Sequence, residues 1–135
     1  MINSKIYKWN PIGNIPNQLY LQSVTNENNN LTILLSMADS ELILSIVFDK
    51  VIFYKSVIET CSLERLDSHP ILSTEWPLFM DEQSEYIEDL IGQSYQIYTR
   101  EDLNHYIITH GGGIIDVICF SQPFVKWLIE PSVIS

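Results

Sequence analysis

The sequence predicts an α+β fold in which a mostly antiparallel β-sheet dominates and one main helix lies near residues 84–93. Two observations favour this class. Short runs rich in Leu, Ile, Val, Phe and Tyr recur along the chain, and turn-forming residues separate them. One segment has hydrophobic residues at helical spacing. The pattern leaves open whether the sheet is curved, forms a half-barrel or folds into a sandwich.

The strand candidates of the middle of the chain follow one another closely. Residues 31–37 and 41–48 are predicted strands, and residues 51–54 continue in β-type residues after a possible tight turn. Short connections join antiparallel neighbours, so we expect these segments to form a meander. Short extended pieces are also predicted at 6–9 and 19–21, an asparagine-rich loop at 26–30 and a strand at 95–98. Residues 124–129 form a final apolar segment. The mixed pattern of residues 59–75 predicts neither a helix nor a strand.

The helix candidate has a defined start. Ser84 is a good N-cap, and acidic residues follow it in the first turn, where they suit the helix dipole. Ile87, Leu90 and Ile91 share one face, which we expect to face a core. Gly92 is expected to end the helix.

Residues 105–109 and 114–120 are predicted to form a hairpin around three consecutive glycines, residues 111–113. The glycines are expected to supply the positive φ angles of the turn. A phosphate-binding loop is disfavoured, because β-branched residues follow where a helix and a Lys-Ser/Thr pair would be needed.

The hairpin raises the question of a catalytic pair. If Thr109 pairs with Ile114, His105 lies opposite Ile118 and Asp116 lies diagonal to His105 on the same face. Such a pair is able to orient a general base. No nucleophile motif accompanies it, however. We therefore expect His105 to be a half-buried, hydrogen-bonded strand residue and Asp116 to be a structural polar residue.

The other histidines and the cysteines predict no metal or cofactor site. His69 is expected in a solvated loop and His110 in the turn, and the three histidines have no ligand spacing. Cys61 and Cys119 match no metal motif either. They are expected to be reduced and buried, with a disulfide as the minority interpretation.

The length and composition of the chain favour a single domain over residues 1–135, and we expect the protein in the cytoplasm. The first five residues do not resemble an export signal, and no apolar run approaches the roughly 20 residues of a membrane helix. The net charge is −10, from 17 acidic and 7 basic residues. A chain this acidic is repelled by phosphate backbones, so nucleic acid is not an expected partner, whereas a basic protein is.

The negative charge is concentrated in residues 75–102, where Arg100 is the only base. The acidic residues of this segment are Glu75, Asp81, Glu82, Glu85, Glu88, Asp89, Glu101 and Asp102. Either they form a solvated face that keeps the protein soluble, or they form a docking surface for a cationic partner. In the second case the predicted contact charges are Glu82, Glu85, Glu88 and Asp89, and the predicted aromatic anchor is Tyr86 or Trp76.

A family resemblance spans residues 48–123. It is carried by the run from Phe48 to Glu59, by Trp76-Pro77-Leu78-Phe79 with Ser84-Glu85-Tyr86, and by residues 105–109 and 115–118 closed by Pro123. The chain resembles small bacterial immunity proteins of polymorphic toxin systems, including those of contact-dependent growth inhibition. The resemblance implies a cytoplasmic inhibitor, without cofactor or catalytic residues, that binds a cognate toxin C-terminal domain, often a nuclease.

Three hypotheses of function remain open at this point. The first is an immunity protein that neutralises its toxin through the acidic surface. The second is a small enzyme that uses His105 and Asp116. The third is a structural or adaptor subunit of a larger assembly. The sequence does not decide the oligomeric state or the toxin's activity.

Overall fold

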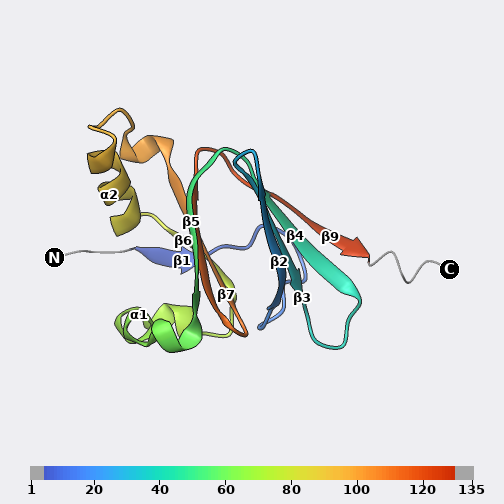
Figure 1. The fold of residues 1–135 in the computed structure, drawn as a ribbon. Helices are drawn as coiled ribbons and strands as arrows, with labels where there is room; N and C mark the ends of the chain where they lie inside the picture. Colours follow the sequence, from blue (N-terminus) through green and yellow to red (C-terminus); the bar gives the residue numbers. More distant parts are fainter. Residues whose placement is uncertain (1–4, 130–135) are drawn as a thin grey trace.

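The computed structural model describes residues 5–129, so the start and the end of the chain lie outside the described residues. Within residues 5–129, nine strands form two antiparallel sheets that face each other and do not close into a barrel (Figure 1). The strands are β1 (Ile6–Lys8), β2 (Tyr20–Glu27), β3 (Asn30–Ser36), β4 (Leu42–Phe48), β5 (Val51–Ile58), β6 (Leu78–Asp81), β7 (Asn104–His110), β8 (Gly113–Cys119) and β9 (Phe124–Ile129). The α+β class with β dominant is therefore confirmed.

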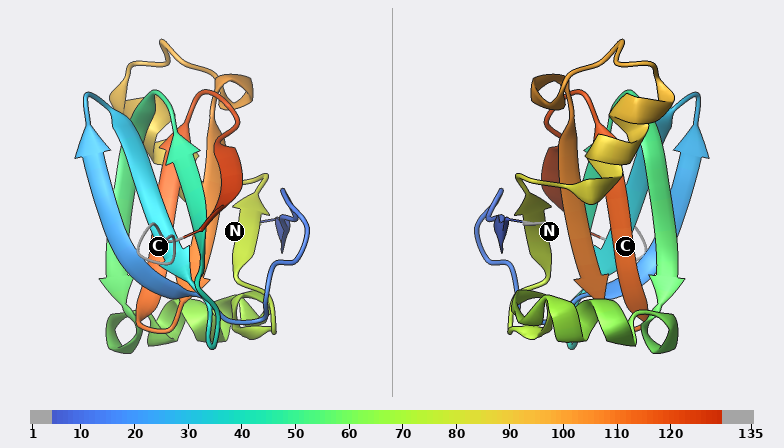
Figure 2. Two further views of the ribbon diagram at one scale, coloured as in Figure 1. Left: turned by 90° about the vertical axis from the view of Figure 1, so that its right-hand side faces the viewer. Right: turned by 90° about the vertical axis from the view of Figure 1, so that its left-hand side faces the viewer.

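Helical segments lie outside the five-stranded sheet. They are α1 (Leu63–Ser68), α2 (Glu85–Gln93) and the 3-10 turns η1 (Glu59–Cys61), η2 (Pro70–Ser73) and η3 (Arg100–Asp102). Figure 2 shows α1 and α2 at opposite ends of the outer face of this sheet. Among the described residues, none of the helices has the length and apolar character needed to cross a bilayer.

The strand order is β1-β6-β7-β8-β5 in one sheet and β2-β3-β4-β9 in the other. The predicted pairing of residues 31–37 with 41–48 is confirmed by β3 and β4. The predicted meander is wrong in its third strand, because β5 crosses to the other sheet and β4 pairs with β9 instead. A two-residue connection at residues 49–50 allows β5 either to pair with β4 or to cross to the other sheet. The long-range pairing of β5 with β8 decides between these two.

The main core fills the space between the two sheets. Alternate residues of β3 and β4, including Leu35 and Leu44, meet alternate residues of β7 and β8, including Tyr106 and Val117. Because strand side chains alternate, the other residues of β7 and β8 point to the opposite face, toward the helices. Two smaller apolar clusters form there, one near α1 and η2 and one under α2.

The helix prediction is confirmed. Ser84 caps α2, since its hydroxyl oxygen accepts a hydrogen bond from the Ile87 amide at 3.2 Å, and Ile87 is buried. The helix ends at Gln93, one residue beyond Gly92. The strand predicted at residues 95–98 is absent from the described residues. Turns replace it, because the backbone there enters the left-handed region.

The asparagine-rich stretch is shorter as a loop than predicted. Only Asn28 and Asn29 form the turn, with φ of 54° and 65°, while Asn26 and Asn30 belong to β2 and β3. Positive φ at both central residues is the geometry of a tight hairpin turn, and asparagine tolerates it.

The β7–β8 hairpin has the predicted register, with Thr109 opposite Ile114 and His105 opposite Ile118. The reason given for its glycines is wrong, because no described glycine has a positive φ. Glycine is required at two of these positions because there is no space for a Cβ atom. A Cβ atom on Gly113 would lie 2.1 Å from the carbonyl oxygen of Val57 on β5, and one on Gly111 would lie 2.9 Å from the Tyr20 ring.

We predict that Gly113→Ala destabilises the fold by about 3 kcal/mol, the upper end of the cost of overpacking, since a backbone carbonyl cannot move aside as a side chain can. Urea denaturation measures the change in the free energy of unfolding. Gly112→Ala is the control, because its nearest atoms belong to the His110 ring at 3.6 Å. Equal effects of the two substitutions would contradict this account.

Candidate functional site

A group of polar side chains lies on the outer face of the five-stranded sheet, between α1 and α2. Asp116 of β8 and His105 of β7 are brought there by the hairpin register. Arg65 reaches them from α1, and Ser84 reaches them from the N-cap of α2. The group is therefore assembled from four elements distant in the sequence.

The contacts form one continuous hydrogen-bonded network. Both terminal nitrogens of Arg65 bond to the two oxygens of Asp116 at 2.6 Å each. The Nε2 atom of His105 lies 2.7 Å from Asp116 Oδ1, and its Nδ1 atom lies 2.6 Å from Ser84 Oγ. Asp116 is 0% exposed and His105 is 1% exposed. Buried charge of this kind is stable only when it is paired and hydrogen-bonded.

Every described polar atom of the network has a partner in one arrangement of the protons. His105 donates its Nε2–H to Asp116, and Nδ1 accepts the Ser84 hydroxyl proton. The Ser84 oxygen in turn accepts from the Ile87 amide. Burial alone would raise the pKa of Asp116, but its hydrogen bonds with Arg65 and His105 outweigh burial and hold the pKa below 3.8.

Tyr86 covers the network on the side of α2. Its ring lies edge-on to His105, with the centroids 5.5 Å apart, and it stacks on Phe53 at the same centroid distance. The Lys55 ammonium donates to the Tyr86 hydroxyl and lies 4.3 Å from the ring centroid. Tyr86 is half-buried and packs in this layer. Its role as an aromatic anchor stays a prediction.

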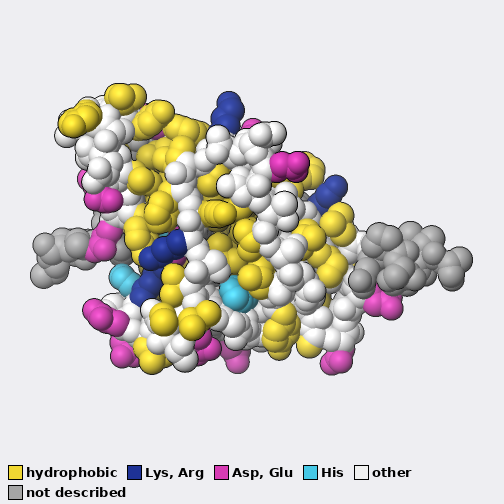
Figure 3. All heavy atoms as spheres, viewed as in Figure 1, with side chains coloured by type: hydrophobic (Ala, Val, Ile, Leu, Met, Phe, Trp, Pro, Cys, Tyr) yellow, Lys and Arg dark blue, Asp and Glu magenta, His cyan; other side chains and the backbone are white. Residues whose placement is uncertain are grey.

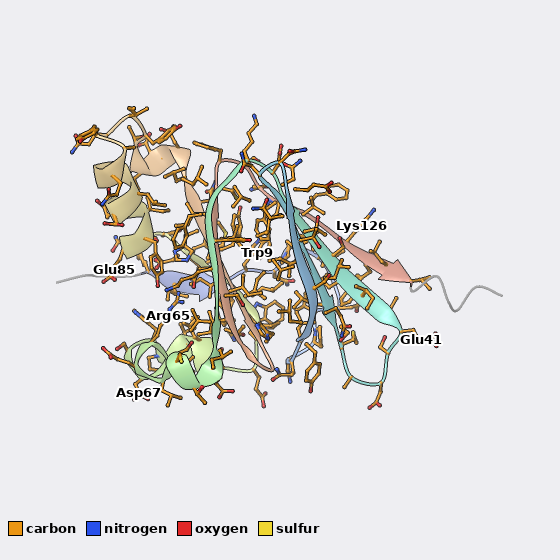
Figure 4. All side chains as sticks on the ribbon, viewed as in Figure 1. Trp9, Glu41, Arg65, Asp67, Glu85 and Lys126 are labelled. Atoms are coloured by element: carbon orange, nitrogen blue, oxygen red, sulfur yellow. The ribbon has the colours of Figure 1, made fainter. Side chains whose placement is uncertain are left out.

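A pocket of about 600 Å³ opens between α1 and α2, with His105 on its wall. Figure 4 shows Arg65 and Glu85 on the two sides of this region. The titratable side chains that line it are Lys55, Cys61, Glu64, Arg65, His69, Asp81, Glu85, Tyr86 and His105. Both signs of charge are present, and no three potential metal ligands of the described chain come together.

Ser84, His105 and Asp116 have the composition of a nucleophile–base–acid series, but their arrangement differs. In the serine hydrolase triad, Nε2 of histidine faces the serine and Nδ1 faces the acid. Here the two ring atoms are exchanged. Ser84 is also fully buried, does not line the pocket, and already serves as the helix cap. The geometry fits a structural network better than a catalytic one.

Sequence reasoning found the register of His105 and Asp116 but missed their partners. His105 was expected to be half-buried and is fully buried. Arg65 lies in the stretch that had no assignment, and Ser84 was recognised only as a cap. The available signal was the pair itself. Two ionisable residues on a hairpin face that otherwise carries mainly Ile require a buried partner.

The four predicted contact charges share an exposed surface. Glu82, Glu85, Glu88 and Asp89 are all exposed on α2 and in the turn before it. Glu88 forms a surface ion pair with Arg100, whose guanidinium also bonds to the Glu82 carbonyl at 3.0 Å. Asp81 is the exception among the acidic residues of this segment. It is buried and accepts from the amides of Lys5 and Gln83.

Trp76 is separated from this surface. It is half-buried in the cluster near α1 and η2, and its indole nitrogen donates to the Trp9 carbonyl at 3.1 Å. Trp76 therefore packs in a different apolar cluster from α2, and its role as an aromatic anchor stays a prediction.

The burial of the two thiols differs in part from the prediction. Both cysteines are free, but Cys61 is exposed at the pocket and only Cys119 is buried. Burial raises the pKa of the Cys119 thiol to about 12. His110 ends β7, where it accepts from the Gly112 amide, and burial lowers the pKa of its ring.

We predict that Arg65→Met costs about 3 kcal/mol in the free energy of unfolding, because it leaves the Asp116 carboxylate buried without its cation. Arg100→Met is the matched control. It removes an exposed ion pair, which is worth no more than about 1 kcal/mol. Urea denaturation of both variants measures the contrast. Equal losses would show that Arg65 and Asp116 do not form a buried pair in solution.

The pH dependence of stability follows from the same network. The pKa of Asp116 is lower in the folded chain than its usual 3.8. The stabilisation that the ionised carboxylate gives the fold is therefore complete above that usual value. It is lost as the pH falls from there through the lower pKa of the folded chain. The difference in unfolding free energy between wild type and Asp116→Asn should therefore be largest near about pH 6 and shrink below about pH 4. A difference that stays constant down to about pH 3 would contradict this assignment.

Comparison with known proteins leaves the function to be argued from this geometry. No model of a protein family, no curated protein and no solved structure matches the chain.

Proposed function

We propose that this chain is a cytoplasmic immunity protein that binds and neutralises a cognate bacterial toxin domain through an acidic surface around α2. This acidic surface consists of Glu82, Glu85, Glu88, Asp89, Glu101 and Asp102. The proposed partner is the C-terminal domain of the toxin, with a basic surface and nuclease activity. The observation that carries the proposal is the exposure of all six carboxylates on one helix and its adjoining turns.

Like charges of the acidic surface repel each other in the isolated fold. Glu85 lies one turn from Glu88 and Asp89, and like charges at this spacing cost about 0.2–0.5 kcal/mol per pair. Arg100 is the only base within this segment, and its pair with Glu88 is exposed to solvent. In the described structure Glu88 pairs with Arg100 and Asp102 accepts from Thr99. The other carboxylates of this surface are open to an external partner.

The helix that presents these charges is firmly placed. Its first turn is capped by Ser84, which is itself bonded to His105 of β7. Its buried face packs through Ile87 against Leu103 and Ile118. A partner therefore meets charges that are already ordered, which reduces the entropy cost of binding.

The expected mechanism is occlusion. A nuclease must hold an anionic substrate, so its cleft is positively charged, and an acidic inhibitor competes for the same field. Long-range attraction raises the association rate, and close charge pairs then lower the dissociation rate. The enzymatic alternative draws less support, since both ring nitrogens of His105 and both oxygens of Asp116 are already hydrogen-bonded.

A rescue assay tests the proposal. The C-terminal domain of the protein encoded immediately upstream is expressed in cells with and without this chain, and survivors are counted. Survival only with this chain, together with co-purification of the two proteins, is the expected result. Toxicity that the chain does not relieve would overturn the proposal, as would a stable complex with a non-toxic partner.

We predict that the double variant Glu85→Lys/Asp89→Lys binds the toxin domain at least 10-fold more weakly (order of magnitude) and with a flatter salt dependence. Glu27→Lys/Glu41→Lys is the matched control, since it changes the net charge equally at two exposed positions, Glu27 on β2 and Glu41 just before β4. Glu41 and Glu85 lie at opposite ends of the molecule (Figure 4). Equal loss in both variants would show that net charge matters and that this surface does not. Titration calorimetry at several salt concentrations measures both effects.

A further inference from the structure

We infer that the turn directly after α2 is the apolar anchor of the interface, and that Tyr95 and Ile97 insert into an apolar pocket of the toxin domain rimmed by Lys or Arg. This inference rests on the proposed function and adds a contact site that the acidic surface alone does not provide. We call residues 94–98 the anchor turn.

The exposure of the anchor turn is exceptional for apolar side chains. Tyr95 is 93% exposed and Ile97 is 76% exposed, more than any other large apolar side chain of the described residues. In Figure 3 yellow side chains cover the corner of the molecule where α2 ends. Single exposed apolar residues are common, but two at one projecting turn form a patch available to a partner.

The anchor turn is held in a defined conformation. The amide of Tyr95 donates to the Gly92 carbonyl at 3.1 Å, that of Gln96 to Ile91 at 2.9 Å, and that of Ile97 to Ser94 at 3.2 Å. At its far end Tyr98 packs edge-on against Phe120, with the ring centroids 5.2 Å apart. The apolar side chains are therefore exposed although the backbone beneath them is fixed.

The conformation of the turn is strained. Tyr95 and Gln96 have φ angles of 53° and 63°, although neither is glycine. The left-handed region costs a non-glycine residue roughly 1–2 kcal/mol, and strain of this kind is concentrated at functional sites. Packing within the chain does not offset it, because the Tyr95 ring is almost fully in solvent.

The charges around the anchor turn define the partner. Glu88 and Asp89 precede it on α2, and Glu101 and Asp102 follow it on η3, which contacts α2. Arg100, the one base of η3, is paired with Glu88, so the charge around the turn stays negative. A tyrosine and an isoleucine inside an acidic rim resemble the anatomy of a protein interface, in which a few aromatic anchors supply most of the affinity and the rim is polar. The complementary surface is an apolar pocket with a basic rim.

Binding of the purified upstream toxin domain to the full chain tests the inference. Tyr95→Ala/Ile97→Ala is expected to weaken binding about 30-fold or more, mainly through a faster dissociation rate, with the salt dependence of binding unchanged. Phe124→Ala/Ile129→Ala is the matched control. It removes two comparably exposed apolar side chains from β9, in the other sheet, and should change binding less than threefold (order of magnitude). Thermal unfolding of each variant verifies that the chain stays folded.

The possible results distinguish failure of the anchor turn from failure of the proposed immunity function. If wild type binds and Tyr95→Ala/Ile97→Ala binds equally well, the anchor turn is overturned while the immunity function stands. If wild type does not bind the toxin domain, both are overturned. A second readout avoids truncation: Tyr95→Trp should bind normally, and its fluorescence emission should shift to the blue in the complex. Absence of that shift, with binding intact, would also contradict the inference.

Discussion

The rest of the structure depends on the buried carboxylate of Asp116. A charge that is fully removed from water must be paired, and the sheet offers no cation on its own outer face close enough except Lys55, which bonds to Tyr86 instead. Arg65 of α1 supplies the pair, and His105 links it to the cap of α2. One ionic group thus joins both helices to the sheet, between the two apolar clusters. Removal of any one member leaves at least one neighbouring polar group without a hydrogen-bond partner.

This constraint divides the charges of the chain into two kinds. The inner charges, Asp116 and Arg65, are mutually satisfied and set where α1 and α2 lie. The outer charges on α2 have no such partners in the described fold, apart from the exposed pair of Glu88 and Arg100. A network that fixes the helix and a surface that carries uncompensated charge are complementary properties. The first provides the rigidity that makes the second useful for recognition.

The features that follow from local chemistry were predictable from the sequence, and those that depend on long-range choice were not. The Ser84 cap, the amphipathic helix and the β7–β8 register came from periodicity and turn residues. The crossing of β5 to the five-stranded sheet was not predictable, because a two-residue connection allows β5 either to pair with β4 or to cross. Arg65 was missed because its six-residue helix is too short for a periodic signal. The anchor turn was taken for a strand since Tyr95 and Ile97 alternate as strand residues do, and only the backbone shows the left-handed turn.

In the proposed complex, the acidic surface and the anchor turn act on different steps of association. Charges act over distances near the Debye length, about 8 Å at physiological salt, so they mainly raise the rate of encounter with a basic partner. Apolar side chains act only on contact, and mutations that alter such contacts mainly change dissociation. An inhibitor of a lethal enzyme needs both fast capture and slow release. In the proposed complex, the carboxylates in the first half of α2 serve capture, and the apolar turn at the end of the helix serves slow release.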